Sequence, residues 1–151
     1  MQTILGANGQ IGEELARELK RNFTSDIRIV SRNAKKVHET DQVFSADLSI
    51  REQAVEAVKG SDIAYFTLGL PISSDFWEEQ FPLITKNVIE ACKINGTKLV
   101  FFDNTYMYPQ DDRVLKEDTA FAPVGRKGRV RREMAEMVLK AIHSGEIEAV
   151  I

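Results

Sequence analysis

The chain has 151 residues, a formal net charge of −3 and 43% hydrophobic residues, values typical of one globular domain. The slightly acidic balance argues against general attraction to nucleic acid or to an anionic membrane surface, and no apolar run is long enough to span a bilayer. The single cysteine, Cys92, cannot form an internal disulfide, which predicts a reducing, cytoplasmic location.

Strand-like and helix-like segments alternate along the chain. The expected strands span residues 3–5, 27–30, 43–46, 63–68, 99–102 and 147–151. Helical patterns follow residue 10, cover 49–59, and recur around 81–91 and 130–141. Continuously apolar strands between amphipathic helices predict an α/β fold with a doubly wound parallel sheet. The long segment 104–125 follows the fifth strand and is expected to contribute to a ligand site at the carboxyl ends of the strands.

A glycine-rich turn, Gly6-Ala7-Asn8-Gly9-Gln10-Ile11-Gly12, joins the first strand to the first helix. Glycines in this context permit a tight turn and close approach of the backbone to a pyrophosphate, which the free N–H groups of a helix N-terminus attract. The alternative is a turn that serves packing alone. The spacing is G-x-x-G-x-x-G, which differs from the commonest dinucleotide fingerprint.

This glycine spacing resembles the short-chain dehydrogenase/reductase superfamily, in particular the extended branch of NAD(P)-dependent epimerases and dehydratases. Ala46-Asp47-Leu48 resembles the family's adenine-contacting turn, and residues 87–91 match its following helix. The resemblance implies an NAD(P)-binding Rossmann fold over residues 1–151. Because relatives continue into a C-terminal portion that holds most of the substrate site, we expect a domain truncated at the sixth strand, without that portion. The implied cofactor-binding residues are Gly6, Asn8, Gly9, Gln10, Ile11, Gly12, Arg32, Asp47, Leu48, Leu68 and Gly69.

The end of the second strand bears on the choice of cofactor. NAD-preferring sites usually place an acid there to accept the ribose 2′-OH, whereas an arginine suits a 2′-phosphate. Here the strand ends in Val30-Ser31-Arg32-Asn33, with no acid and one guanidinium. NADP is therefore favoured over NAD; the alternative is that Arg32 simply faces solvent. Asp47 has a second interpretation as an N-cap or turn residue before the next helix.

The family's catalytic Tyr-x-x-x-Lys pair is absent. None of the three tyrosines has a lysine four residues later. Alignment with the family pattern puts Gly125 at the tyrosine position and Arg129 at the lysine position, while Asn104 falls where the family has Ser or Thr. The resemblance is therefore to atypical members.

The remaining candidates for catalytic roles are Thr105, Tyr108 and Arg129. Tyr106 or Tyr108 either supplies a proton from the loop or packs its ring and bonds its hydroxyl to nearby backbone. Phe76 and Trp77 are expected in a loop before the 81–91 helix, where Trp77 either lines the pocket or packs.

A dense basic run contains Arg126, Lys127, Arg129, Arg131 and Arg132. Arg129–Glu133 and Arg132–Glu136 are spaced to pair along a helix, so part of the run is expected to be a solvated face. The alternative is that Arg126 or Arg129 contacts a phosphate, while the other members of the run, Arg131 included, are expected to face solvent. His38 and His143 have no carboxylate or second histidine at ligand spacing, and no metal site is expected.

These observations leave three functional hypotheses. The first is an NAD(P)-binding oxidoreductase or epimerase/dehydratase-like protein acting on a nucleotide sugar or a related carbonyl or hydroxyl compound. The second is a non-catalytic NADP(H) sensor similar to NmrA-like regulators, which the missing Tyr-x-x-x-Lys pair favours. The third is an inactive cofactor-binding fragment. The expected partners are the dinucleotide, an unidentified small substrate and a second copy of the chain, with neither nucleic acid nor membrane.

Overall fold

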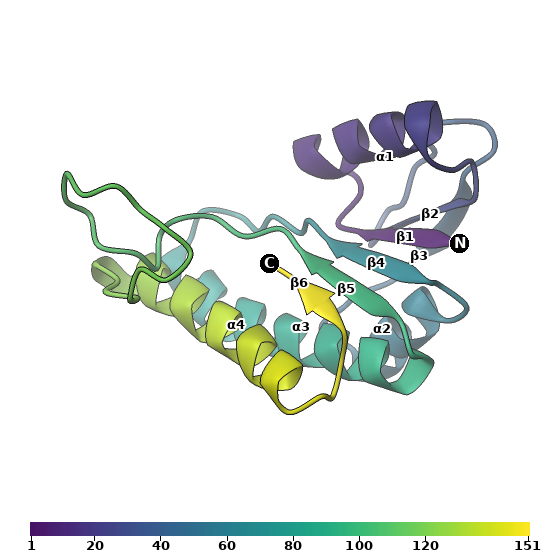
Figure 1. The fold of residues 1–151 in the computed structure, drawn as a ribbon. Coiled ribbons are helices and arrows are strands. Elements are labelled where there is room, and N and C mark those ends of the chain that lie inside the picture. The colour runs from purple at the N-terminus through teal and green to yellow at the C-terminus, as the bar shows by residue number, and fades with distance from the viewer.

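The computed structural model describes all 151 residues and contains one six-stranded parallel sheet (Figure 1). The strands are β1 (Gln2–Leu5), β2 (Ile27–Ser31), β3 (Gln42–Ser45), β4 (Ile63–Phe66), β5 (Lys98–Phe101) and β6 (Ala149–Val150). Their order across the sheet is β3-β2-β1-β4-β5-β6, so the order reverses between β1 and β4. This confirms the predicted doubly wound α/β fold, in which ligands bind at such a reversal.

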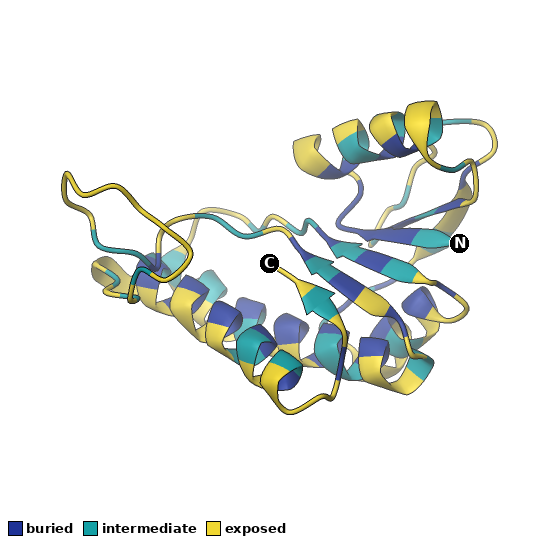
Figure 2. Ribbon diagram, in the orientation of Figure 1, coloured by how far each residue is buried: buried dark blue, intermediate teal, exposed yellow.

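Four helices cover the sheet unequally. The helix α1 (Gln10–Asn22) packs over β1 and β2 on one face. The other face carries α2 (Arg51–Val58), α3 (Ser74–Asn95) and α4 (Gly125–His143), which pack side by side (Figure 1). The connection between β2 and β3 contains no helix. The loop between β5 and α4 projects beyond the carboxyl ends of the strands and is largely exposed (Figure 2).

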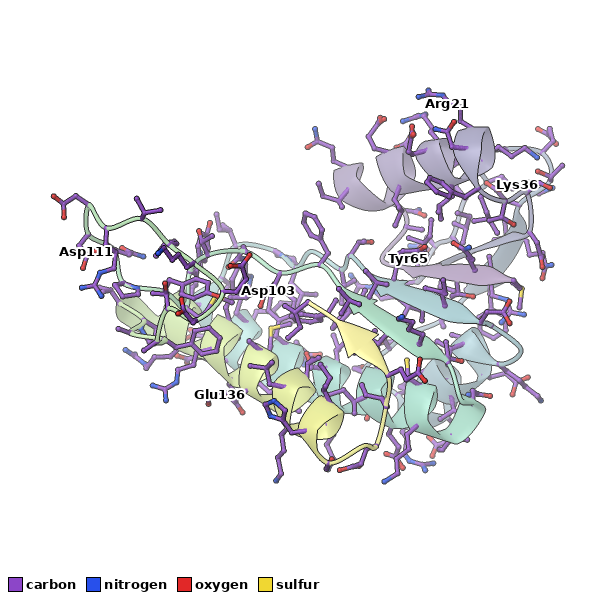
Figure 3. The ribbon with its side chains drawn as sticks, in the orientation of Figure 1. Arg21, Lys36, Tyr65, Asp103, Asp111 and Glu136 are labelled. Carbon is purple, nitrogen blue, oxygen red and sulfur yellow. The ribbon has the colours of Figure 1, made fainter.

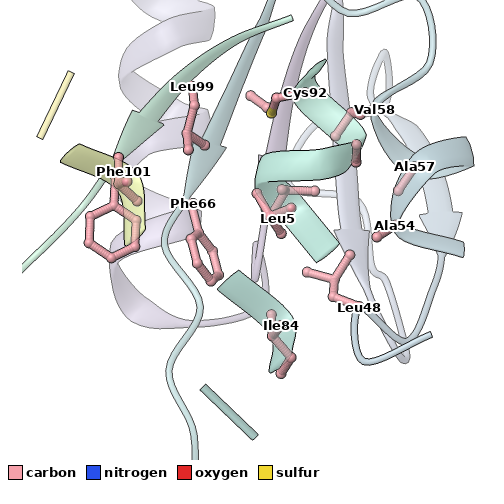
Figure 4. Packing of buried hydrophobic residues seen from close by; sticks show 14 of the residues in the cluster. Leu5, Leu48, Ala54, Ala57, Val58, Phe66, Ile84, Cys92, Leu99 and Phe101 are labelled. Carbon is pink, nitrogen blue, oxygen red and sulfur yellow. The ribbon is translucent and has the colours of Figure 1, made fainter. Parts of the chain in front are cut away.

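The main core fills the space between the sheet and the helices α2, α3 and α4. Strand residues Leu5, Phe66 and Leu99 meet Ile84 and Cys92 of α3 there (Figure 4). A smaller cluster lies under α1 and contains Ile4, Ile29, Ala16 and Leu19. Successive residues of a strand point to opposite faces, so Ile4 and Leu5 enter different clusters. Burial on both faces accounts for the continuously apolar strands seen in the sequence.

The helix α3 begins well before the apolar stripe that predicted it. The Ser73 hydroxyl accepts a hydrogen bond from the Phe76 N–H at 3.4 Å and caps the helix. The prediction that Phe76 and Trp77 precede this helix is therefore wrong, since both lie in its first turn. Periodicity revealed only the buried part of α3, because its first two turns are largely exposed or half-buried.

Cys92 lies in the main core and is 1% exposed, as expected for a core cysteine. Burial raises the pKa of its thiol to about 12. We therefore expect no reaction with an aromatic disulfide reagent at mildly alkaline pH while the protein is folded, because the thiolate is the reactive form. One thiol equivalent should react in concentrated guanidinium chloride. Rapid labelling of the native protein would contradict this placement.

Candidate dinucleotide site

A cavity of about 360 Å³ opens at the carboxyl ends of β1, β2 and β4, where the strand order reverses. Eight of the eleven predicted cofactor residues line it: Gly6, Asn8, Gly9, Arg32, Asp47, Leu48, Leu68 and Gly69. Phe76, Gln80 and Ile84 of α3 form part of the opposite wall and were not predicted from the sequence. A larger hollow, of about 860 Å³, lies at the amino ends of β4–β6 and contains none of the predicted residues.

Two of the three glycines in the first turn are required by packing. Gly6 has φ = 91°, and a Cβ there would lie 2.6 Å from the Leu68 Cα. A Cβ at Gly12 would lie 2.7 Å from the Ala7 Cα, so Gly12 allows the start of α1 to pack against the preceding turn. Gly9 differs, since a Cβ there would meet only the Gly6 carbonyl oxygen, at 3.4 Å.

The start of α1 offers unsatisfied N–H groups to the cavity. Gly9 is the N-cap and provides no side-chain acceptor. The backbone N–H groups of Gln10, Ile11 and Gly12 have no hydrogen-bond acceptor in the chain. Gln10 and Ile11 do not line the cavity with their side chains, so any contact they make with a ligand comes from the backbone. Such N–H groups and the positive end of the helix dipole suit a pyrophosphate.

The loop after β2 forms the wall near the predicted ribose position. Asn8 holds this loop, because its Nδ2 donates to the Asn33 carbonyl at 2.7 Å and its Oδ1 accepts from the Lys35 N–H at 3.4 Å. Arg32 is exposed and reaches the cavity with no acidic side chain beside it on this loop. The Ser31 Oγ is buried, lies on the same wall and has no hydrogen-bond partner.

Asp47 stands at the far wall and closes a turn. Its Oδ1 accepts from the Ser49 N–H at 2.9 Å and from the Ser49 hydroxyl at 2.7 Å. These hydrogen bonds hold the pKa of the carboxyl below its usual range, and the Arg32 charge adds to the effect while burial opposes it. Because α2 begins only after Ile50, Asp47 is a turn residue and not the helix N-cap.

Asn87 supports this wall from α3. Its buried Nδ2 donates to the Leu48 carbonyl at 3.0 Å and to the Ser49 carbonyl at 2.9 Å. The sequence singled out this asparagine only as part of a family pattern. Its role as a tether of the loop after β3 became visible in the structure, because the two segments are 38 or 39 residues apart.

The three candidate catalytic residues lie outside the cavity. Thr105 is exposed in the loop after β5. The Tyr108 ring packs edge-on against Phe121 at 5.2 Å, and Arg129 borders a shallow groove on α4. Gly125, at the position of the family's tyrosine, has φ = 75°. A tyrosine would be strained in that backbone conformation, so the backbone at this position favours glycine. The position therefore differs from the family pattern both in its side chain and in its backbone conformation.

One member of the basic run is buried, which contradicts the expectation of a solvated face for Arg131. The side chains of Arg131 and Asp103 are 6% and 7% exposed, and the Arg131 Nε donates to Asp103 Oδ1 at 2.9 Å. The guanidinium also lies over the rings of Phe81 and Phe101. This pair ties the segment after β5 to α4, and Asp103 is labelled in Figure 3. Sequence spacing did not reveal it, because Asp103 is 28 residues away.

The other cations of the run differ in their partners. Arg126 pairs with Asp75 and Glu78 of α3. The predicted Arg132–Glu136 pair is present at 2.6 Å. The predicted Arg129–Glu133 pair is not formed, and neither Lys127 nor Arg129 has a carboxylate partner.

The surroundings of His38 also differ from the prediction. Its Nδ1 lies 3.4 Å from Oδ1 of Asp41, a buried carboxylate three residues later, so it does have a carboxylate neighbour. Asp41 Oδ2 accepts from the backbone N–H groups of Val37 and His38 and holds the connection between β2 and β3. The structure shows no group of three or more His, Cys, Asp or Glu side chains suited to a metal ion.

The strand order, the left-handed glycine turn and the uncapped start of α1 converge on one cavity and define a Rossmann-type dinucleotide-binding domain. A family model described as NAD(P)H-binding matches residues 6–119. The chain therefore belongs to this NAD(P)H-binding family. Among curated protein sequences, none matches it.

Solved structures show the same fold. Uronate dehydrogenase from Agrobacterium tumefaciens is 19% identical with a TM-score of 0.83, covering 98% of this chain and 57% of that one. MoeE5 in complex with UDP-glucose and NAD is 22% identical with a TM-score of 0.82, covering 98% and 51%. UDP-glucose 4-epimerase from Thermus thermophilus, in complex with NAD, is 17% identical with a TM-score of 0.82, covering 99% and 53%.

The chain thus spans about half the length of these solved proteins. The family match confirms the predicted NAD(P)-binding domain, and the solved structures, which include dehydrogenases and an epimerase, confirm the predicted fold. None of the helices is both long enough and apolar enough to cross a membrane.

Proposed function

We propose that residues 1–151 form the dinucleotide-binding domain of an oxidoreductase or epimerase-like protein that prefers NADP(H) and acts on a sugar or nucleotide sugar. One observation carries the cofactor preference: Arg32 and the unpartnered Ser31 hydroxyl line the cavity together, and residues 31–37, at and after the end of β2, include no acid. Both groups can bind a 2′-phosphate. The sugar assignment is supported by the names of the structural neighbours, a uronate dehydrogenase and a UDP-glucose epimerase.

The residues present fit the cofactor. The glycine turn leaves room for close approach, the start of α1 supplies free N–H groups, and Asp47 with the loop held by Asn87 forms the adenine end of the cavity. When bound, a nicotinamide dinucleotide supplies or accepts a hydride. The chain's own contribution, in this proposal, is to bind and orient it.

Replacing Arg32 tests the cofactor preference. We expect Arg32→Ala to weaken NADPH binding by about 30-fold, because a charge-assisted hydrogen bond of about 2 kcal/mol is lost. NADH binding should change little. Isothermal titration calorimetry measures both affinities, and Arg21→Ala, on the outer face of α1 (Figure 3), is the matched control. Equal losses for the two dinucleotides would contradict the assignment of a 2′-phosphate partner.

A non-catalytic NADP(H) sensor is the second candidate, and Gly125 is the observation that favours it. This position lacks the tyrosine that acts as the family's acid, and its φ of 75° disfavours residues with a Cβ. The two candidates differ in turnover. Incubation with reduced or oxidised dinucleotide and a panel of sugars, sugar acids and nucleotide sugars, followed by nicotinamide absorbance, separates them. Binding without any hydride transfer supports the sensor.

A further inference from the structure

We infer that Trp77, Tyr106 and Lys127 form a binding subsite for an anionic sugar, meaning a sugar ring that carries a carboxylate or a phosphate. The inference rests on the proposed function, since it assigns the sugar ligand of that function; none of the three residues lines the dinucleotide cavity itself. The three residues come from the first turn of α3, the loop after β5 and the first turn of α4. All three segments follow the carboxyl end of a strand, and Phe76, next to Trp77, lines the dinucleotide cavity.

The cluster has an aromatic surface and one cation. The rings of Trp77 and Tyr106 are nearly parallel, with 16° between their planes and 6.5 Å between their centroids. The Lys127 ammonium lies 5.2 Å from the centroid of the Trp77 indole. Aromatic faces pack well against the C–H face of a sugar ring, and a lysine ammonium binds a carboxylate or phosphate as a point charge.

The protein holds these side chains in place. The Trp77 indole N–H donates to the Pro71 carbonyl at 2.9 Å, and the Trp77 ring meets Phe81 edge-on at 4.9 Å. The Tyr106 N–H donates to Asn104 Oδ1 at 3.0 Å. Gly128 brings α4 against this loop, because a Cβ there would lie 2.7 Å from the Tyr106 carbonyl oxygen. The aromatic faces are thus fixed before any ligand arrives, which lowers the entropic cost of binding.

The ammonium of Lys127 lies over the Trp77 ring and has no carboxylate partner in the chain. Arg126, Arg131 and Arg132 of the same helix each pair with a carboxylate, whereas Lys127 is half-buried and has none. The Tyr106 ring is 45% exposed, and its hydroxyl makes no hydrogen bond. A half-buried cation without a carboxylate partner selects an anionic ligand over a neutral one, because burial strengthens the attraction between opposite charges.

Intrinsic fluorescence tests the subsite directly, since Trp77 is the only tryptophan. The protein is titrated with glucuronate, with glucose-6-phosphate and with glucose, both in the presence of saturating NADP⁺ and in its absence. We expect a saturable change with at least one of the two anions and none with glucose. The two anions distinguish a carboxylate ligand from a phosphate ligand.

Two variants complete the experiment. Lys127→Gln should weaken anion binding about tenfold, the loss expected for one charge-assisted contact. Lys140→Gln, an exposed lysine in the last turn of the same helix, should leave it unchanged, and thermal melts verify that both variants fold. No response to either anion, an equal response to glucose, or equal behaviour of the two variants overturns the subsite. If calorimetry shows that NADP⁺ does not bind, the proposed function is overturned instead. The titrations without dinucleotide still test whether the subsite binds an anionic sugar.

Discussion

Replacing Gly6 with alanine is expected to destabilise the protein by about 4 kcal/mol, a large share of the roughly 5–15 kcal/mol that stabilises a typical domain. Two costs add. Gly6 has φ = 91°, a conformation that strains an L-residue by about 1–3 kcal/mol. The new Cβ would also lie 2.6 Å from the Leu68 Cα and 2.8 Å from its backbone nitrogen. Backbone atoms cannot move aside as a flexible side chain can, so overpacking adds about 1–3 kcal/mol.

Gly145→Ala is the matched control for this substitution. Gly145 also has a positive φ, 71°, but a Cβ there meets nothing within 4 Å. Gly145→Ala should therefore lower the free energy of unfolding only through backbone strain, by about 1 kcal/mol. Thermal unfolding without ligand measures both variants, and we expect the melting temperature to fall by about 12 °C for Gly6→Ala and about 3 °C for the control. Equal shifts would show that contact between the glycine turn and the residues after β4 is unimportant.

Removing Arg131 should be similarly costly. Arg131→Met leaves the Asp103 carboxylate buried without its partner, which typically costs about 3–5 kcal/mol. Arg132→Met, the neighbouring residue in an exposed pair with Glu136, should cost less than about 1 kcal/mol. Denaturant unfolding of the two variants makes the comparison. Adding Asp103→Leu to Arg131→Met should recover much of the loss, because no unpaired charge then remains buried.

The pH dependence of this variant has a definite sign. Burial raises the pKa of Asp103, while the Arg131 charge opposes that rise. A carboxyl whose pKa is higher in the folded protein than in the unfolded chain favours folding less as the pH increases through that interval. Loss of Arg131 removes the opposing influence and raises the pKa further. The deficit of Arg131→Met relative to the parent protein should therefore be smallest at acid pH and grow toward neutral pH. A deficit independent of pH would contradict the buried, desolvated pair.

Both predictions concern contacts that connect the candidate site to its scaffold. Gly6 lets the turn touch the segment after β4, and the Asp103–Arg131 pair joins the end of β5 to the helix that carries Lys127. The dinucleotide wall and the proposed sugar subsite are thus positioned by neighbouring strands of one sheet. Because these strands are parallel, their carboxyl ends meet at the same edge of the sheet. A small shift of the glycine turn or of the Asp103–Arg131 pair should therefore disturb both the dinucleotide cavity and the sugar subsite.

The amino-acid sequence alone determined the doubly wound fold, since hydrophobic periodicity and strand-ending turns are local properties of the chain. It also located most of the cavity wall, because the glycine turn, Arg32, Asp47 and Gly69 each follow a strand. Only the tertiary structure decided which distant side chains meet. It buried Arg131 against Asp103, tied Asn87 to the loop after β3, and brought Trp77, Tyr106 and Lys127 together. Such pairings depend on how helices pack across a sheet, and that geometry is set by the whole core and not by any single segment.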